Sequence, residues 1–485
     1  MAKATDGLKP ELVWKYFEEI ARIPHCSGNE AAISKYVAAT AKRLGLAAKM
    51  DPVGNVIVSK PASPGRENVR SVVLQGHLDM VGEKNKDKVH NFDKDPIELV
   101  RTNNWIMANG TTLGADNGIA VATNLAIMED KSLEHGPLEF LFTVDEERGL
   151  TGAKGISGDF VKSRILMNLD SEEEGELYVG CAGGRDAMGS WNVEFVNSSA
   201  QAVPGLLKVA GLRGGHSGLE IDKGRGNAIK IINRILMALA DLGARISTLN
   251  GGNKRNAIPR EVEAKLYIPK KSWDQATNLV GEFNATVKAE YATVEPGLEI
   301  SLTAIKGAKK GKVLKGVFQK KLLKTLSALP HGVIKMSPDI PGLVQTSTNV
   351  AIVTTGRKSI SVATSQRSSV ASEIIEISRM VANVFDLGGA QVRSSDGYPG
   401  WKPNLESEIL KIAKETYQSL YGKEPAVKAV HAGLECGIIG EKFPGMDMVS
   451  FGPTLQAVHS PEEKLFIDTV EKFWTFLLAI LKNIR

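Results

Sequence analysis

The sequence predicts an α/β protein in which a helix-covered sheet forms one domain and a second domain is inserted in the middle of the chain. Three observations indicate this. Helical and strand-like segments alternate up to about residue 185, the pattern changes near residue 186, and the alternation returns beyond residue 400. The predicted boundaries are 1–185 and 397–485 for the two parts of the first domain and 186–396 for the insertion.

The first part is predicted to open with two amphipathic helices. Apolar residues recur at helical spacing over 11–20 and 29–44, and a Ser-Gly-Asn sequence suited to capping stands at the start of the second. Short apolar runs bounded by turns predict strands at 55–59, 71–74, 138–144 and 165–169. A helix is predicted over 118–128.

The inserted part has a different order of elements. Its predicted strands are 191–196, 205–209, 262–268 and 360–363, and its predicted helices are 227–242, 273–285 and 369–385. A glycine-rich loop is predicted over 211–218. The last part returns to a helix, a strand and a closing helix, at 405–420, 446–451 and 461–481. If the middle is an insertion, functional residues should occur on both sides of it.

Composition and charge narrow the function classes. The excess of 60 Lys and Arg over 55 Asp and Glu gives a net charge of only +5, which does not favour a nucleic-acid partner. The one basic concentration, residues 306–324, includes Lys309 and Lys310. It has no stacking aromatic beyond Phe318, so we interpret it as a solvated surface.

Cysteine content and apolar runs indicate the compartment. Cys26, Cys181 and Cys436 are far apart and odd in number, so no disulfide framework is predicted. No stretch approaches the ~20 apolar residues of a membrane span. We therefore expect a cytoplasmic protein without a membrane partner. No paired histidine supports a cysteine nucleophile.

Ligand-type side chains stand at or just after the predicted strands. They are His77, Asp79, Glu146, Glu147, Asp170 and His459, and Asp116 opens the helix that follows one strand. Taken singly, each has an ordinary interpretation, such as a helix cap for Asp116 or a solvated loop for the acidic run. In an open α/β sheet, however, sites assemble at the carboxyl edge of the strands. The joint placement predicts one functional site.

The types of side chain predict a centre for two metal ions. Two histidines and three carboxylates could hold two zinc ions if one carboxylate bridges them. Paired ions of this kind polarise a carbonyl group and activate a water molecule. A further carboxylate must act as general base, and the neighbours Glu146 and Glu147 provide one side chain for each task. Spacing alone does not assign the two. Asp79 could orient the ring of His77.

Six segments resemble the motifs of the M20 metallopeptidases, and among them the aminoacyl-histidine dipeptidases. They are Gly76-His77-Leu78-Asp79-Met80-Val81, Leu113-Gly114-Ala115-Asp116-Asn117-Gly118, Asp145-Glu146-Glu147, Leu169-Asp170-Ser171, His431-Ala432-Gly433-Leu434-Glu435-Cys436-Gly437 and Val458-His459-Ser460-Pro461-Glu462-Glu463. The resemblance covers essentially the whole chain. It implies a mixed-sheet, zinc-binding catalytic domain interrupted by an inserted α+β lid domain.

The resemblance also implies the arrangement of the ligands. Asp116 would bridge two divalent ions. His77 and Asp170 would complete one site, and Glu147 and His459 would complete the other. Zinc is the expected metal, with cobalt or manganese as alternatives.

Further roles follow from the same resemblance. Asp79 would orient His77, and Glu146 would take the proton of the attacking water. His216, in the glycine-rich loop, would reach over the metals and donate a hydrogen bond to the developing oxyanion, worth ~3 kcal/mol. Without the resemblance, a backbone-bonding histidine in a turn is the preferred interpretation of His216.

Four residues are expected to contact a small peptide substrate. Asn256 and Arg367 resemble lid positions that bind the terminal carboxylate, for which the planar fork of arginine is suited. His431 and Glu435 lie in a turn that fits the substrate pocket near the free amine. The implied substrates are unblocked dipeptides, including Xaa-His.

Two other functions stay open. An amidohydrolase or deacylase acting on N-acyl amino acids would keep the metals, and the requirement for a free amino group would separate it from a dipeptidase. A non-catalytic metal-binding scaffold is the second alternative. Glu146 argues against it, because a scaffold needs no general base beside a complete ligand set. A homodimer is left open.

Overall fold

The computed structural model describes residues 3–306 and 311–485, so Lys309 and Lys310 lie outside the described residues. The chain divides into two compact units. Unit 1 contains Met1–Gly180, Pro403–Ala429 and Leu434–Arg485, and unit 2 contains Cys181–Lys402 and Val430–Gly433. The predicted α/β fold class is confirmed. The identification of the middle part as a lid stays a prediction.

Unit 1 is built on an eight-stranded mixed sheet. In spatial order its strands are β1 (Ala47–Met50), β2 (Val56–Lys60), β6 (Leu138–Thr143), β3 (Val72–His77), β7 (Ile165–Asn168), β23 (Asp447–Ser450), β8 (Glu176–Cys181) and β22 (Ala426–Val430). The four central strands, β6, β3, β7 and β23, run parallel. Strands β3, β6 and β7 are buried along their whole length, which explains their near-continuous apolar sequences.

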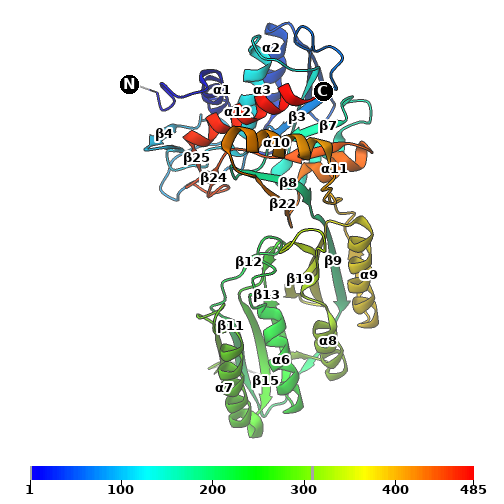
Figure 1. Cartoon of the computed structure of the whole chain (residues 1–485). Helices are drawn as coiled ribbons and strands as arrows, with labels where there is room; N and C mark the ends of the chain where they lie inside the picture. The colour runs from blue at the N-terminus through cyan, green and yellow to red at the C-terminus, as the bar shows by residue number, and fades with distance from the viewer. Residues whose placement is uncertain (1–2, 307–310) are drawn as a thin grey trace. The chain divides into compact units, whose positions relative to one another are not determined.

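Helices pack around this sheet. They are α1 (Glu11–Ala21), α2 (Ala31–Arg43), α3 (Ala115–Glu129), α10 (Glu408–Tyr421), α11 (Glu435–Lys442) and α12 (Ile467–Asn483), with the short α4 (Glu146–Gly149) and α5 (Thr151–Gly155). Helix α3 packs against β3 and against α1, and Figure 1 shows α10 and α12 side by side. The predicted helices at 11–20, 29–44 and 118–128 are therefore confirmed.

The closing helix begins later than predicted. Residues 461–466 are not helical, because Lys464–Phe466 forms strand β25 and pairs with β5 (Trp105–Ala108). Strands β24 (Leu455–Gln456) and β4 (Leu99–Thr102) complete a four-stranded sheet. Pairing with a strand distant in sequence overrode the local helical pattern. This sheet joins the last segment of the chain to a segment before the insertion.

Unit 2 contains a nine-stranded antiparallel sheet. Its main order is β16 (Glu299–Ala304), β11 (Ala202–Ala210), β15 (Val262–Pro269), β13 (Arg245–Gly251), β19 (Val344–Thr355), β20 (Ser359–Ser368), β9 (Gly183–Asn192) and β21 (Gln391–Ser394), with β18 (Gly332–Met336) paired to β19. Its helices are α6 (Ala228–Asp241), α7 (Trp273–Glu290), α8 (Gly316–Ala328) and α9 (Ala371–Leu387). In Figure 1, α6 and α7 cover β11, β13 and β15, and Ile232, Leu266 and Val362 are among the buried residues of the shared core.

One predicted strand of unit 2 is wrong. Residues 191–196 do not form a single strand, because β9 ends at Asn192 and the separate strand β10 (Phe195–Asn197) pairs with β17 (Lys312–Leu314). Val193 N still donates to Lys358 O beside the end of β9, and the chain leaves this sheet only after Val193. Among the described residues, no helix has the length and apolar composition needed to cross a membrane.

Candidate metal centre

The predicted ligands gather at one edge of the unit 1 sheet. His77 is the last residue of β3, the run Asp145-Glu146-Glu147 follows β6, and Asp170 follows β7. Because β3, β6 and β7 are parallel, their carboxyl ends share an edge. Asp116 lies in the first turn of α3, and His459 lies between β24 and β25. The structure thus brings together residues from both sides of the insertion.

The five predicted ligands form two groups that share Asp116. In the first group, His77 Nε2 lies 3.0 Å from Asp116 Oδ1 and 3.3 Å from Asp170 Oδ1. In the second, His459 Nε2 lies 3.2 Å from Asp116 Oδ2 and 2.9 Å from Glu147 Oε1. Each group offers one imidazole nitrogen and two carboxylate oxygens within 4.8 Å of one another. The two oxygens of Asp116 face different groups, as expected of a bridging carboxylate.

The tautomer of His77 suits a metal ligand. Its Nδ1 donates to the backbone oxygen of Asp79 at 3.0 Å, so Nε2, which faces Asp116 and Asp170, is the nitrogen available to a metal ion. The Asp79 carboxylate is farther away, with Oδ1 3.5 Å from Nδ1. Asp79 therefore holds the His77 ring mainly through its backbone.

The arrangement of charged groups in the centre favours the binding of cations. Burial lowers the pKa of His77, but Asp170 and Asp116 outweigh it and raise that pKa well above its ordinary value. Hydrogen bonds to Asp116 and Glu147 raise the pKa of His459 to about 11. Burial raises the pKa of Asp170 to about 6 and that of Glu172, beside it, to about 8. The raised pKa values of these two carboxyl groups indicate a buried concentration of carboxylates, which a cation would stabilise in the charged form.

The donor atoms fit divalent transition metals. Imidazole nitrogens and carboxylate oxygens are ligands of zinc, and three protein ligands per ion leave a position open for water or substrate. The alternative of an ordinary helix cap for Asp116 does not fit, because the N-cap of α3 is Gly114 and the two oxygens of Asp116 lie 3.0 Å from His77 Nε2 and 3.2 Å from His459 Nε2.

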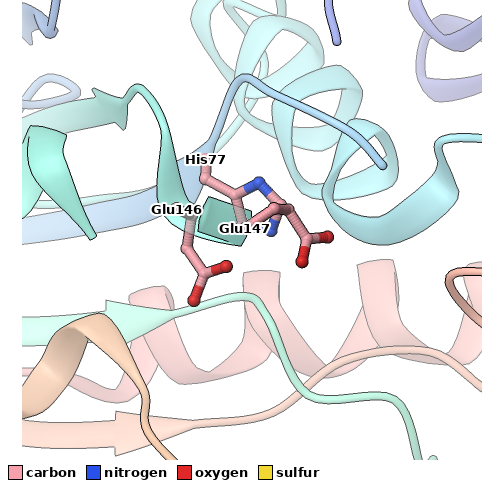
Figure 2. A group of neighbouring side chains, drawn as sticks. All are labelled: His77, Glu146 and Glu147. Atoms are coloured by element: carbon pink, nitrogen blue, oxygen red, sulfur yellow. The ribbon is translucent and has the colours of Figure 1, made fainter. Parts of the chain in front are cut away.

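Glu146 lies beside the two ligand groups that share Asp116 but is a member of neither. Figure 2 shows its carboxylate pointing away from that of Glu147, although both lie next to His77. Burial raises the pKa of Glu146 well above its ordinary value, and Asp170, Glu435 and Glu147 add to the rise. This carboxylate is a stronger base than an exposed one.

The Asp79 carboxylate supports Glu146 and Glu147 rather than only His77. Its Oδ1 accepts from Glu146 N at 2.9 Å, and its Oδ2 accepts from Glu147 N at 3.2 Å and from Ser27 Oγ at 2.7 Å. Asp79 is 1% exposed. It thereby satisfies the first N–H groups of α4 and fixes the turn that presents both glutamates. The sequence prediction for Asp79 had not included this contact.

We expect Asp79→Asn to weaken metal binding and lower kcat by about 10- to 100-fold. The amide nitrogen cannot accept the hydrogen bonds that one carboxylate oxygen accepts, so the α4 turn loses an anchor. Metal titration of the apoprotein and steady-state rates measure the effect. The matched control is Asp447→Asn, because Asp447 also anchors the first turn of a helix, accepting from Ser407 Oγ and Ile409 N, but does so at the amino end of β23. Equal effects of the two substitutions would contradict the assignment.

A buried row of polar side chains lies under the centre. Gln75 Nε2 donates to Glu435 Oε2 at 2.6 Å, Thr143 Oγ1 donates to the same oxygen at 2.6 Å, and Asn168 Nδ2 donates to Gln75 Oε1 at 2.6 Å. Ser450 Oγ continues the row to Asn168 Oδ1. All five side chains are 0% exposed. Sequence reasoning missed this row, although each central parallel strand carries one of its members as a polar residue at or near its carboxyl end.

Four other predicted site residues lie in unit 2, namely His216, Asn256, Arg367 and His431. His216 Nδ1 accepts from Gly218 N at 3.2 Å and Leu219 N at 3.1 Å, so its proton is on Nε2. Burial and Arg367 lower the pKa of His216 to about 4, which keeps the ring neutral. Asn256 is exposed, and its backbone oxygen accepts from Ser217 N at 2.8 Å. His216 and Asn256 line a cavity of about 690 Å³.

Arg367 and His431 are buried polar residues of unit 2. Arg367 is 7% exposed, its Nη1 donates to Tyr398 Oη at 3.1 Å, and its Nε has no partner among the described residues. His431 shares a hydrogen bond of 2.7 Å with Ser347 Oγ. Burial and Arg367 lower the pKa of His431 to about 3. A buried arginine with a free N–H suits an anionic ligand.

Comparison with known proteins gives a consistent set of relatives. Residues 73–483 match the family described as peptidase family M20/M25/M40. The chain is 41% identical over 478 residues to the cytosol non-specific dipeptidase of Escherichia coli (strain K12), and the match covers 98% of both chains. It is also 41% identical to the aminoacylhistidine dipeptidase of Vibrio alginolyticus, with a TM-score of 0.91 and coverage of 100% and 98%.

A more distant structure shares the fold. The aminopeptidase PepT of Bacillus cereus is 17% identical, with a TM-score of 0.56 and coverage of 98% of this chain and 99% of that chain.

Proposed function

The chain belongs to peptidase family M20/M25/M40, and from this premise we propose that it is a metal-dependent dipeptidase that hydrolyses unblocked dipeptides, including Xaa-His. The observation that carries the proposal is the pair of ligand groups in unit 1 that share Asp116. The names of the two relatives with 41% identity support the substrate class.

Two divalent ions, with zinc as the favoured metal and cobalt or manganese as substitutes, would occupy these groups. His77 and Asp170 would hold one ion, Glu147 and His459 would hold the other, and Asp116 would bridge them. When bound, such ions polarise the scissile carbonyl and make water easier to deprotonate. The imidazole and carboxylate donors and the excess of buried negative charge support this assignment.

Glu146 would act as general base. It would take a proton from the attacking water and deliver it to the leaving amine. Three features support the role: its side chain is next to both ligand groups, it is not needed as a ligand in either, and its burial strengthens it as a base. Asp79 would hold the turn from which Glu146 projects.

Unit 2 would recognise the substrate and its transition state. His216, neutral and protonated on Nε2, would donate to the developing oxyanion. Arg367 and Asn256 would bind the terminal carboxylate, and the buried Nε of Arg367 without a partner supports this role.

The other end of the dipeptide would meet His431 and Glu435. Glu435 Oε2 is used by Gln75 and Thr143, whereas its Oε1 has no partner among the described residues. That oxygen can accept from an ammonium group. A requirement for the free amine would follow, because blocking it removes the donor.

The remaining proposals concern the setting of the enzyme. We propose a cytoplasmic location, supported by the name of the Escherichia coli relative and by the low cysteine content. Its partners would be small peptides, and association into a homodimer is compatible with this function. Deacylation of N-acyl amino acids and a metal-binding scaffold are the competing functions.

A panel of substrates tests the proposal. The purified protein, after metal analysis, is assayed on Xaa-His and other dipeptides and on their N-acetylated forms. We expect hydrolysis of the free dipeptides only, loss of the rate with a chelator, and recovery on adding zinc. A preference for N-acyl substrates would instead establish a deacylase. Bound metal without any hydrolysis would support the scaffold.

A further inference from the structure

The carboxylate of Glu463 lies inside the loop that carries Asp116. Its Oε2 accepts from Leu113 N at 2.8 Å and Gly114 N at 3.2 Å. Its Oε1 accepts from Ala115 N at 2.8 Å and Asp116 N at 3.3 Å. Four successive backbone N–H groups therefore converge on one side chain, in the manner of an anion-binding nest. Glu463 is 2% exposed, so its carboxylate is shielded from solvent.

Glu463 reaches this loop from the far side of the insertion. It follows His459 by four residues, and Glu463 N donates to Ser460 O at 3.0 Å, which closes the segment into a turn. The carboxylate therefore ties the segment that carries His459 to the loop that carries Asp116. These are the two ligands whose Nε2 and Oδ2 atoms lie 3.2 Å apart.

The other side of the Asp116 loop is fixed to the sheet. Asn117 Oδ1 accepts from His77 N at 3.2 Å, and Asn117 Nδ2 donates to Leu169 O at 2.9 Å. Gly114, at φ +70°, allows the turn between the two anchors, and a Cβ there would lie 2.7 Å from Met80 Sδ. With Asn117 on one side and Glu463 on the other, the backbone of Asp116 is held from both directions.

We propose that Glu463 is a positioning residue of the metal centre, which sets the distance between Asp116 and His459 across the insertion. The inference rests on the proposed function, since it takes these two residues as ligands. The N–H groups that Glu463 gathers belong to the loop that carries Asp116, and the last of them is the N–H of Asp116 itself, so a change in Glu463 acts directly on the position of this residue. Without it, four buried donors lose their acceptor and the loop can rearrange.

Glu463→Gln tests the proposal, because the amide keeps the size of the side chain but turns one acceptor oxygen into a donor. We expect the ion shared by Asp116 and His459 to bind about 10- to 100-fold more weakly in titrations of the apoprotein. The amides of residues 113–116 should exchange faster with deuterium, and cobalt spectra should change. Glu463→Asp, which retains the charge but shortens the reach, should give smaller changes of the same kind and covers the case in which the glutamine variant does not fold.

The matched control is Glu139→Gln. Glu139 is 7% exposed, lies near the start of β6, and accepts from Lys162 N and Ser163 N away from the metal edge. The Glu139→Gln substitution should lower the melting temperature of the protein without changing its affinity for the metal. If the variants at Glu463 change only the melting temperature, as Glu139→Gln does, the proposal is overturned. Asp116→Ala tests the underlying proposal of a metal centre separately from the role of Glu463. If that variant retained both ions, the metal centre itself would be refuted.

Discussion

The Glu146→Ala protein is expected to retain its metal ions and its substrate affinity and to hydrolyse dipeptides about 10²- to 10⁴-fold more slowly. Glu146 lies beside the ligand groups, but each group has one histidine and two carboxylates without it. Its removal therefore takes away the proton acceptor rather than a ligand. Metal content by elemental analysis and kcat and KM on a free dipeptide measure the outcome.

A neighbouring carboxylate provides the control for Glu146. Asp145 belongs to the same acidic run, but its Oδ1 accepts from Arg148 Nε at 2.7 Å. Asp145→Asn suits the left-handed backbone at φ 52° and should leave kcat nearly unchanged. Full activity of Glu146→Ala with its metal in place would exclude the proposed base. Loss of metal from that variant would instead make Glu146 a ligand.

The placement of the centre could be predicted because local and global signals agree. Apolar strands β3, β6 and β7 are recognisable from composition, and parallel pairing then brings His77, the run at 145–147 and Asp170 to one edge. The connection of His459 to this edge depends on the insertion, which a change in the element pattern indicated. The division of roles between Glu146 and Glu147 came only from the family resemblance.

The parts that sequence reasoning missed depend on contacts distant along the chain. Residues 461–466 have a helical pattern, yet Lys464–Phe466 pairs with Trp105–Ala108. Glu463 was recognised only as part of the motif at 458–463, yet its two oxygens accept from the backbone N–H groups of residues 113–116. Glu435 was expected to contact substrate, and its bonds to Gln75 and Thr143 were not foreseen. No local periodicity encodes such pairs, because they are fixed by the packing of separate segments.

Replacement of His459 by alanine is expected to remove one of two metal ions. Loss of a residue that only hydrogen-bonds to a metal ligand costs about 10- to 100-fold in activity, and loss of the ligand His459 should cost more. Asp116 and Glu147 would be left as two carboxylates without a nitrogen donor, while His77, Asp116 and Asp170 stay complete. The His459 side chain is 49% exposed, so its removal creates no core cavity. Metal stoichiometry, kcat and thermal melting with and without zinc measure the change.

His459→Ala also tests whether the metal ion or the Glu463 contact holds the segment that returns after the insertion. His459→Ala should gain less stability than the wild type on adding zinc, because a ligand stabilises only the state that binds it. The measured quantity is this gain for each protein, since the hydrogen bonds of His459 to Asp116 and Glu147 also stabilise the wild-type apoprotein. His90→Ala, at a histidine away from both ligand groups, should keep the full gain. A wild-type stoichiometry in His459→Ala would show that the second ion has other ligands, and the division of the centre between the two segments would be wrong.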